Sequence, residues 1–111
     1  MKDLELRKAL DNYVKERGLV DEDELPILLT DHSYDKSIVG ITTEGRIVYN
    51  YTSMINEYIE DEQCSWEEAQ EWIDYNTMRA IPYFGPMRPI VLDLDRKEII
   101  GIYGEGEYTD D

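Results

Sequence analysis

The sequence has almost no positive charge in its middle part. Between Arg46 and Arg79, 32 consecutive residues contain neither Lys nor Arg. The same segment contains eight carboxylates, namely Glu57, Glu60, Asp61, Glu62, Glu67, Glu68, Glu71 and Asp74. A surface of this sign repels nucleic acid and anionic membranes and attracts basic protein surfaces. The segment therefore excludes direct nucleic-acid binding or membrane association as its role, and it favours a protein partner.

Cysteine and long apolar runs are also scarce. Of the 111 residues only Cys64 is a cysteine, so no disulfide can form within the chain. The first ten residues mix acids and bases and contain no apolar stretch of the kind found in a secretory leader. No run reaches the roughly 18 apolar residues of a membrane span. We expect a soluble, non-secreted protein of a reducing cytoplasm.

Motifs of known chemistry are missing as well. Asp31, His32 and Ser33 supply the residue types of a hydrolase triad, but sequence neighbours do not converge in that geometry, and we interpret His32 as a turn residue. Cys64 is surrounded by acids that would raise its pKa, which disfavours a reactive thiol. One Cys and one His cannot make a zinc site, and no calcium-loop or phosphate-loop spacing is present. We expect no catalytic residues, no cofactor and no dedicated metal site.

The composition is nevertheless that of a folded protein. Apolar residues make up 41% of the chain, and nine Tyr, two Trp and one Phe argue against disorder. The length suits a single domain over residues 1–111, with a frayed Gly- and acid-rich tail at 104–111. The net charge of −15 lies almost entirely after residue 18.

Hydrophobic periodicity predicts an α+β fold. The expected helices cover about residues 2–17, 50–62 and 65–80, and the expected strands cover 25–29, 37–42, 47–49, 90–94 and 99–103. Gly45 supplies the positive φ of a hairpin turn between the second and third strands. Asn50 caps the second helix, and Ser65 with Glu68 makes a capping box for the third. We expect an antiparallel sheet of three to five strands, with about three helices packed mainly on one face.

The second expected helix ends unfavourably. Glu60, Asp61 and Glu62 occupy its last turn, where carboxylates oppose the helix dipole at a cost of a few tenths of a kcal/mol to about 1 kcal/mol each. Local stability therefore does not account for these residues. We predict that all eight carboxylates of the base-free segment form a partner-binding surface. The alternative interpretation is that they are a solvated face that keeps the protein soluble.

The segment from Trp72 to Tyr83 is unusual in composition. Asn76 falls on the apolar stripe of the third helix, which predicts that it is buried and hydrogen-bonded. We predict a structural lock in which Asn76, Thr77 and Arg79 hold the helix end against the Pro-rich loop that follows. A functional groove formed with Tyr83 and Phe84 is the alternative.

A family resemblance lies in the same region. The run WIDYNTMRAIPY, with VGITTEGRIVYNY before it and PIVLDL after it, resembles a family of small proteins of phages and mobile elements of Gram-positive bacteria. The similarity covers about residues 34–95 and includes the motif IDYNTxRAxPY. The family has no assigned catalytic residues to carry over. What the resemblance implies is a bacterial host cell and an anti-defence role, such as that of anti-CRISPR proteins.

Two functional hypotheses follow. The first is a non-enzymatic inhibitor that blocks a nucleic-acid-binding host protein, such as a CRISPR nuclease, by presenting carboxylates in place of phosphates. The second is a structural or regulatory interaction module, or a homodimer, that acts through the aromatic loop of residues 83–89 or an exposed strand edge.

Overall fold

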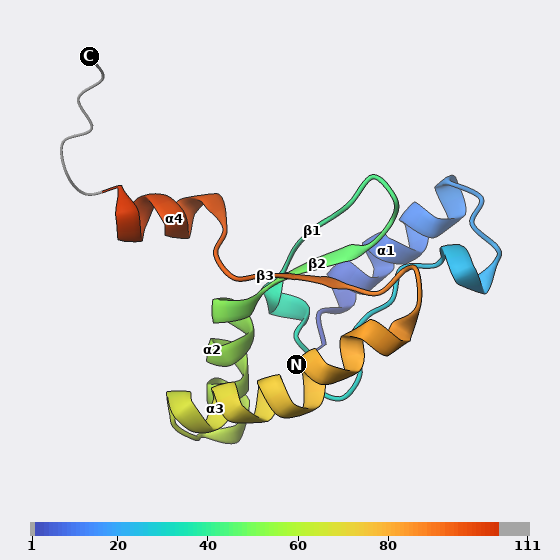
Figure 1. Cartoon of the computed structure of the whole chain (residues 1–111). Helices are drawn as coiled ribbons and strands as arrows, with labels where there is room; N and C mark the ends of the chain where they lie inside the picture. Colours follow the sequence, from blue (N-terminus) through green and yellow to red (C-terminus); the bar gives the residue numbers. More distant parts are fainter. Residues whose placement is uncertain (1, 105–111) are drawn as a thin grey trace, which may run out of the picture.

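The computed structural model describes residues 2–104, and within them four α-helices accompany a three-stranded mixed sheet (Figure 1). The helices are α1 (Leu4–Glu16), α2 (Tyr51–Glu62), α3 (Trp66–Trp72) and α4 (Arg96–Tyr103), and the strands are β1 (Ile38–Ile41), β2 (Ile47–Asn50) and β3 (Ile90–Leu92). A π-helix (Ile73–Met78) continues α3, and short 3₁₀ helices cover Glu22–Glu24, Asp35–Ser37 and Ile81–Phe84. The α+β class is confirmed. Most of the predicted tail, residues 105–111, lies outside the described residues.

The β1–β2 hairpin forms as predicted. Ile38 pairs with Tyr49 and Ile41 with Ile47 in antiparallel register, with an irregularity at Val39. Gly45 has φ +94°, and its amide donates to the carbonyl of Thr42 at 2.9 Å. A Cβ on Gly45 would lie 3.1 Å from Cε of Met87, so both the turn and the packing favour glycine here.

The prediction of an all-antiparallel sheet is wrong. β3 pairs with β2 in parallel, with Val48 opposite Ile90 and Asn50 opposite Leu92. The reason is the connection between them, because α2, α3 and the π-helix carry the chain back to the end of the sheet from which β2 started. A parallel neighbour requires such a long crossover, whereas a short turn would have produced an antiparallel one.

Two predicted strands are absent. Residues 25–29 are extended but pair with no strand, and the amide of Leu29 donates instead to the hydroxyl of Tyr49 at 3.0 Å. Residues 99–103 belong to α4 rather than to a strand beside β3. Asp95 and Glu98 form a capping box at the start of α4, and this local helix signal outweighs the β-branched content of the segment.

The core lies between β2, α2 and α3. Ile47, Tyr49, Met54, Ile55 and Ile73 are each at most 1% exposed. An ion pair connects α1 to the rest of the molecule. The guanidinium of Arg7 donates to both carboxylate oxygens of Asp35 at 2.6 and 2.9 Å. Asp35 is only 2% exposed, so the carboxylate of this ion pair is buried.

α4 departs from the predicted arrangement of packed helices. None of its residues is buried, and it extends from the end of β3 away from the rest of the molecule (Figure 1). No helix among residues 2–104 combines the length and the apolar character needed to cross a membrane.

Candidate acidic interface

The predicted contact residues lie on α2 and α3, which form a tight helical pair. Only residues 63–65 connect the two helices. Gln63 makes the turn in a left-handed conformation with φ +52°, and its amide donates to the carbonyl of Ile59 at 2.7 Å. The carboxylates at the end of α2 and at the start of α3 therefore come together at one end of the helix pair.

α3 is well anchored. Ser65 accepts from the amide of Glu68 at 3.1 Å, and the carboxylate of Glu68 accepts from the amide of Ser65 at 3.0 Å, which completes the predicted capping box. These hydrogen bonds lower the pKa of Glu68 below its usual value. Ala69 and Ile73 are fully buried on the opposite side of the same helical run. The acidic side of α3 is thus presented from a helix whose inner side is packed into the core.

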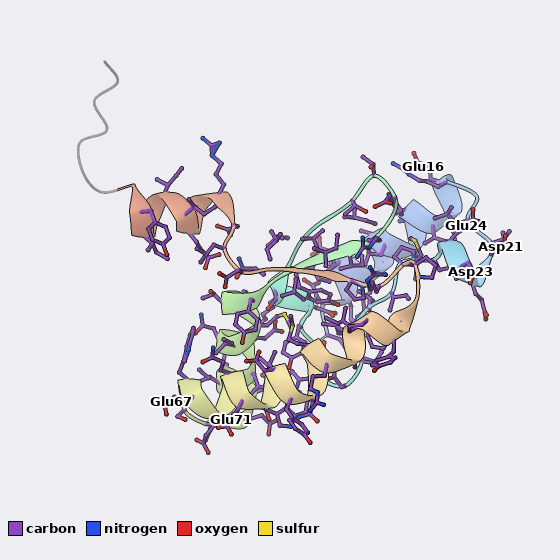
Figure 2. The ribbon with its side chains drawn as sticks, viewed as in Figure 1. Glu16, Asp21, Asp23, Glu24, Glu67 and Glu71 are labelled. Atoms are coloured by element: carbon purple, nitrogen blue, oxygen red, sulfur yellow. The ribbon has the colours of Figure 1, made fainter. Side chains whose placement is uncertain are left out.

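Seven of the eight predicted carboxylates are exposed. They are Glu60, Asp61, Glu62, Glu67, Glu68, Glu71 and Asp74, here termed the acidic face. Figure 2 shows Glu67 and Glu71 on the outer side of α3. Glu57 does not belong to this face, and its prediction as a surface contact is wrong. It is 6% exposed and accepts a hydrogen bond from the Ser37 hydroxyl at 2.9 Å, because its position on α2 turns it toward the short helix before β1.

Some carboxylates of the acidic face form hydrogen bonds or ion pairs with other residues of the chain, and others do not. Oδ2 of Asp61 lies 3.1 Å from Nε2 of His32, and Oε1 of Glu60 lies 3.8 Å from Nζ of Lys36. Asp74 accepts from the Tyr51 hydroxyl at 2.5 Å.

Burial and the Asp74 carboxylate raise the pKa of Tyr51 to about 12, so this hydroxyl remains a donor at neutral pH. Within residues 2–104, no hydrogen bond or ion pair engages the carboxylates of Glu62, Glu67 or Glu71. These three are the members of the face that remain available to a partner.

A second acidic cluster lies at the other end of the molecule. Glu16, Asp21, Asp23 and Glu24 gather where α1 ends and the first 3₁₀ helix begins, far from Glu67 and Glu71 in the view of Figure 2. Asp21, Asp23 and Glu24 are all exposed. These two groups of carboxylates are therefore separate surfaces.

The predicted lock against the Pro-rich loop does not form through the side chains of Asn76, Thr77 and Arg79. Thr77 is 1% exposed, and its hydroxyl donates to Asp31 at 2.6 Å, which ties the π-helix to the loop before β1 rather than to the Pro-rich loop. Asn76 is exposed, contrary to the prediction, and its side-chain amide donates to the carbonyl of Trp72 at 2.9 Å. The π-helix shifts the helical register, and Asn76 leaves the buried stripe for that reason. Arg79 is exposed, with its guanidinium 4.8 Å from the ring centroid of Tyr75.

Sequence reasoning missed an aromatic cluster around His32. The imidazole lies 4.8 Å from the ring of Tyr34, 5.1 Å from Tyr58 and 6.4 Å from Trp72 between centroids. Tyr58 and Trp72 stack on each other at 4.9 Å and so join α2 to α3. The available signal was the place of Tyr58 and Trp72 on the apolar stripes of their helices. His32 is a loop residue that packs behind the acidic face and pairs with one of its members.

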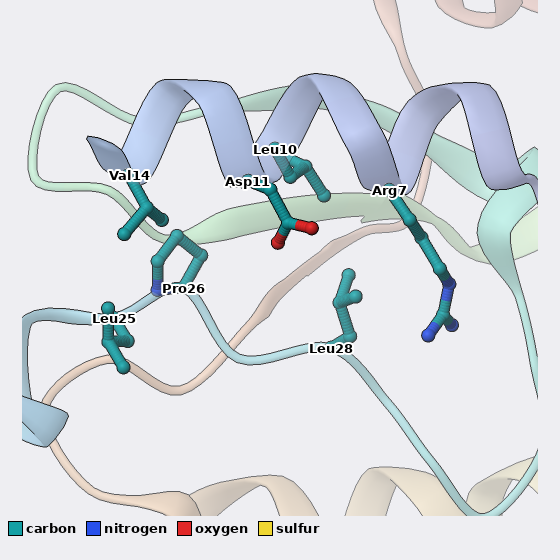
Figure 3. Close-up of a pocket in the computed structure, with 7 residues that line it drawn as sticks. All are labelled: Arg7, Leu10, Asp11, Val14, Leu25, Pro26 and Leu28. Atoms are coloured by element: carbon teal, nitrogen blue, oxygen red, sulfur yellow. The ribbon is translucent and has the colours of Figure 1, made fainter. Parts of the chain in front are cut away.

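Another groove lies elsewhere, between α1 and the segment 25–28 (Figure 3). It encloses about 420 Å³ and is lined by Arg7, Leu10, Asp11, Val14, Leu25, Pro26 and Leu28. The lining is mostly aliphatic, and the guanidinium of Arg7 is already engaged by Asp35. Across the described residues, no three His, Cys, Asp or Glu side chains gather in a way that could hold a metal ion.

Comparisons with known proteins found no match to any family model, curated protein or solved structure.

Proposed function

We propose that this protein is a non-enzymatic binding protein whose acidic face docks on a basic protein surface. The supporting observation is the state of Glu62, Glu67 and Glu71. These side chains are exposed, they have no hydrogen-bond or ion-pair partner within residues 2–104, and two of them lie on a helix with a capped start and a buried inner side. Carboxylates held in this way lose little conformational freedom of the backbone when they bind.

The basic surface that we propose is the nucleic-acid-binding channel of a bacterial host protein, for example a CRISPR nuclease. Residues four apart on a helix are separated by about 6 Å along its axis, which is the relation of Glu67 to Glu71. Successive phosphates of one DNA strand are about 3.4 Å apart along the duplex axis and farther apart along the curved backbone. The two spacings are similar enough for carboxylates to occupy phosphate positions. In this proposal the protein acts as an inhibitor in the bacterial cytoplasm.

The test is affinity capture from a Gram-positive lysate at about 50 mM and about 500 mM salt, because exposed charges are largely screened at the higher concentration. A captured nucleic-acid-binding protein is then purified and titrated with the wild type and with Glu62→Gln/Glu67→Gln/Glu71→Gln. We expect about tenfold weaker binding by the triple variant, from rim charges worth roughly 0.5 kcal/mol each. DNA should compete with the wild type for the same partner.

The second acidic cluster supplies the matched control. Asp21→Asn/Asp23→Asn/Glu24→Gln changes the net charge by the same amount at the other end of the molecule (Figure 2). If both triple variants weaken binding equally, only the net charge matters and the proposed face is rejected. If neither does, the carboxylates serve solubility alone.

A second candidate function is an interaction module that uses the aromatic loop. Tyr83 is 88% exposed and Phe84 is 37% exposed, and aromatic side chains of this kind are frequent anchors of protein interfaces. Tyr83→Ala/Phe84→Ala would weaken partner binding without a change in salt dependence if this loop is the contact. That outcome separates it from the acidic face.

A further inference from the structure

α4 is the one α-helix among the described residues whose large apolar side chains face solvent together. Ile99 is 48% exposed, Ile100 55%, Ile102 57% and Tyr103 73%. At about 100° per residue, these four side chains fall within an arc of about 160° around the helix axis. Lys97 and Gly101 lie on the opposite side. The helix is therefore amphipathic, but its apolar side has nothing to pack against within the chain.

The start of α4 is nevertheless fastened to the body. Asp95 accepts from the amide of Glu98 at 2.8 Å, and Glu98 accepts from the amide of Asp95 at 3.0 Å. Glu98 also accepts from the side-chain amide of Asn50 at 2.5 Å, and Asn50 is the 4% exposed N-cap of α2. These bonds direct the helix axis away from the body (Figure 1). The apolar side is thus held outward rather than left on a loose end.

A helix of this length needs an external packing surface. α4 has eight residues, whereas isolated helices shorter than about 12 residues are marginal in water. Its capping box helps, but propensity and caps alone do not make so short a helix stable. Contact along the apolar side would supply the missing stabilisation.

A groove of complementary character lies near the base of α4. It encloses about 240 Å³, and its apolar lining comes from Tyr51, Met78 and Val91. Asp93, which precedes the start of α4 by three residues, lies on its rim together with Asp74. One chain therefore carries both an exposed apolar helix and, at the foot of that helix, an open apolar groove.

We infer that α4 docks on α4 of a second copy of this chain, antiparallel and around a two-fold axis. In this arrangement the tip of each helix, Ile102 and Tyr103, reaches the groove at the base of the other. Two-fold pairing uses the same patch on both subunits, so a chain that carries both parts needs no other partner. At about 12 Å, α4 has the length to bring its tip to the base of an antiparallel neighbour.

Charge between the two helices favours the same arrangement, whereas Asp74 and Asp93, which line the groove, oppose the negative end of the incoming helix. α4 carries Arg96 and Lys97 against Glu98, a net of +1 in a chain of −15. Antiparallel packing places the basic first turn of each helix beside the negative C-terminal end of the other. Glu67, Glu71 and the second acidic cluster lie away from α4 (Figure 2). The dimer therefore does not bring Glu67, Glu71 or the second acidic cluster face to face, and Asp74 is the one member of the acidic face that lies at the groove.

The interface is of modest size. If a fully exposed side chain of this size presents roughly 200 Å², the four apolar residues of α4 offer roughly 450 Å² for burial. Specific interfaces bury about 800 Å² on each partner, and the groove contributes only part of the difference. We therefore expect a weak dimer that dissociates on dilution.

Light scattering coupled to size exclusion, over a dilution series of the full chain, tests this inference. We expect a mass that rises from 13.1 kDa toward about twice that value with concentration. Ile99→Glu/Ile102→Glu should stay at the monomer mass throughout. Leu4→Glu/Val20→Glu changes two apolar residues that are 77% and 84% exposed elsewhere, and it should dimerise like the wild type. Circular dichroism confirms that each variant is folded.

Cross-linking gives a second measurement that does not depend on a strong dimer. With Cys64→Ser as background, Ile99→Cys lies near the proposed two-fold axis and should form a disulfide-linked dimer under mild oxidation. Val20→Cys in the same background should not. A wild type that is monomeric at about 1 mM with no cross-link through residue 99 would overturn the inference, as would a dimer that survives the α4 substitutions. A monomer whose α4 binds only a different protein would also overturn it. None of these readouts depends on the acidic face.

Discussion

α3 and α4 are two short helices that start in the same way and end in opposite environments. Each begins with a capping box, Ser65 with Glu68 in one case and Asp95 with Glu98 in the other. α3 buries Ala69 and continues into the buried Ile73, whereas α4 buries nothing. The outer side of α3 is acidic and that of α4 is apolar. The comparison shows that a local start signal says nothing about which side of a helix the fold will cover.

The largest expected change in stability comes from truncating a buried isoleucine after α3, and the matching truncation in α4 should have little effect. Ile73→Ala removes a fully buried side chain and should lower the free energy of unfolding by about 3 kcal/mol. Ile100→Ala, at a position 55% exposed, should change it by less than about 0.5 kcal/mol at concentrations where the chain is monomeric. Urea unfolding at low protein concentration measures both. Equal losses would mean that α4 packs on the body.

Asp35, unlike the exposed carboxylates of the acidic face, should contribute strongly to the stability of the fold. Burial alone raises the pKa of Asp35, but the hydrogen bonds from the Arg7 guanidinium and the Asp3 amide outweigh it and lower the pKa below its usual value. Asp35→Asn should therefore lower the free energy of unfolding by about 2–3 kcal/mol at neutral pH. This is somewhat less than the loss expected for a fully buried ion pair, because the side chain of Arg7 is 27% exposed.

The pH dependence of this loss has a definite sign. Because the pKa of Asp35 is lower in the folded state, its stabilisation is present above the unfolded pKa of about 4 and is lost as the pH falls through the folded pKa. The stabilities of the wild type and Asp35→Asn should converge below about pH 4. Denaturant titrations from pH 7 to pH 2 measure this. A difference that stays constant over the range would contradict the role of Asp35.

Removing the N-cap of α3 or of α4 should have a smaller effect on stability, and the two effects should differ. Ser65→Ala should lower the global free energy of unfolding by about 1 kcal/mol, because α3 unfolds with the core. Asp95→Ala should leave the global value nearly unchanged and instead speed amide hydrogen exchange within α4, which frays by itself. Hydrogen exchange followed residue by residue distinguishes the two cases. Slow exchange in α4 of the Asp95 variant at high dilution would show that the apolar side of α4 packs on the rest of the chain.

The smallest effect is expected on the acidic face itself. Glu67→Gln/Glu71→Gln should change the free energy of unfolding by no more than about 0.5 kcal/mol, because neither side chain has a hydrogen-bond or ion-pair partner within the described residues. Thermal unfolding measures this. A loss of stability well above that value would assign these carboxylates to the fold rather than to a partner.

Much of the local structure could be predicted from the sequence. The hairpin around Gly45, the Asn50 cap, the Ser65 capping box and the position of β3 all agree with the predictions. Asp95 with Glu98 has the residue types of the same box, but the β-branched content of residues 99–103 predicts a strand there. Strand propensity depends on context, and without a neighbouring strand this segment follows its local helix start instead.

The candidate site could be predicted less completely. Seven of the eight carboxylates are exposed, as the sequence suggested, but the burial of Glu57 depends on Ser37, twenty residues away. The exposure of Asn76 depends on the π-helix, for which the sequence carries no simple signal. The cluster around His32 joins a loop to two helices that are distant in the sequence. Contacts of this kind arise from packing and not from local periodicity.

By itself, the sequence determined where the charge lies, where helices begin and where the chain reverses in the hairpin. These features depend on bonds between residues three or four apart, such as Ser65 with Glu68, and on the backbone freedom of Gly45. Only the tertiary structure decided the parallel pairing of β3 with β2, the burial of Glu57 and the exposure of the apolar side of α4. Each of these depends on which distant segments cover one another, because burial is a property of the assembled core and not of any one segment.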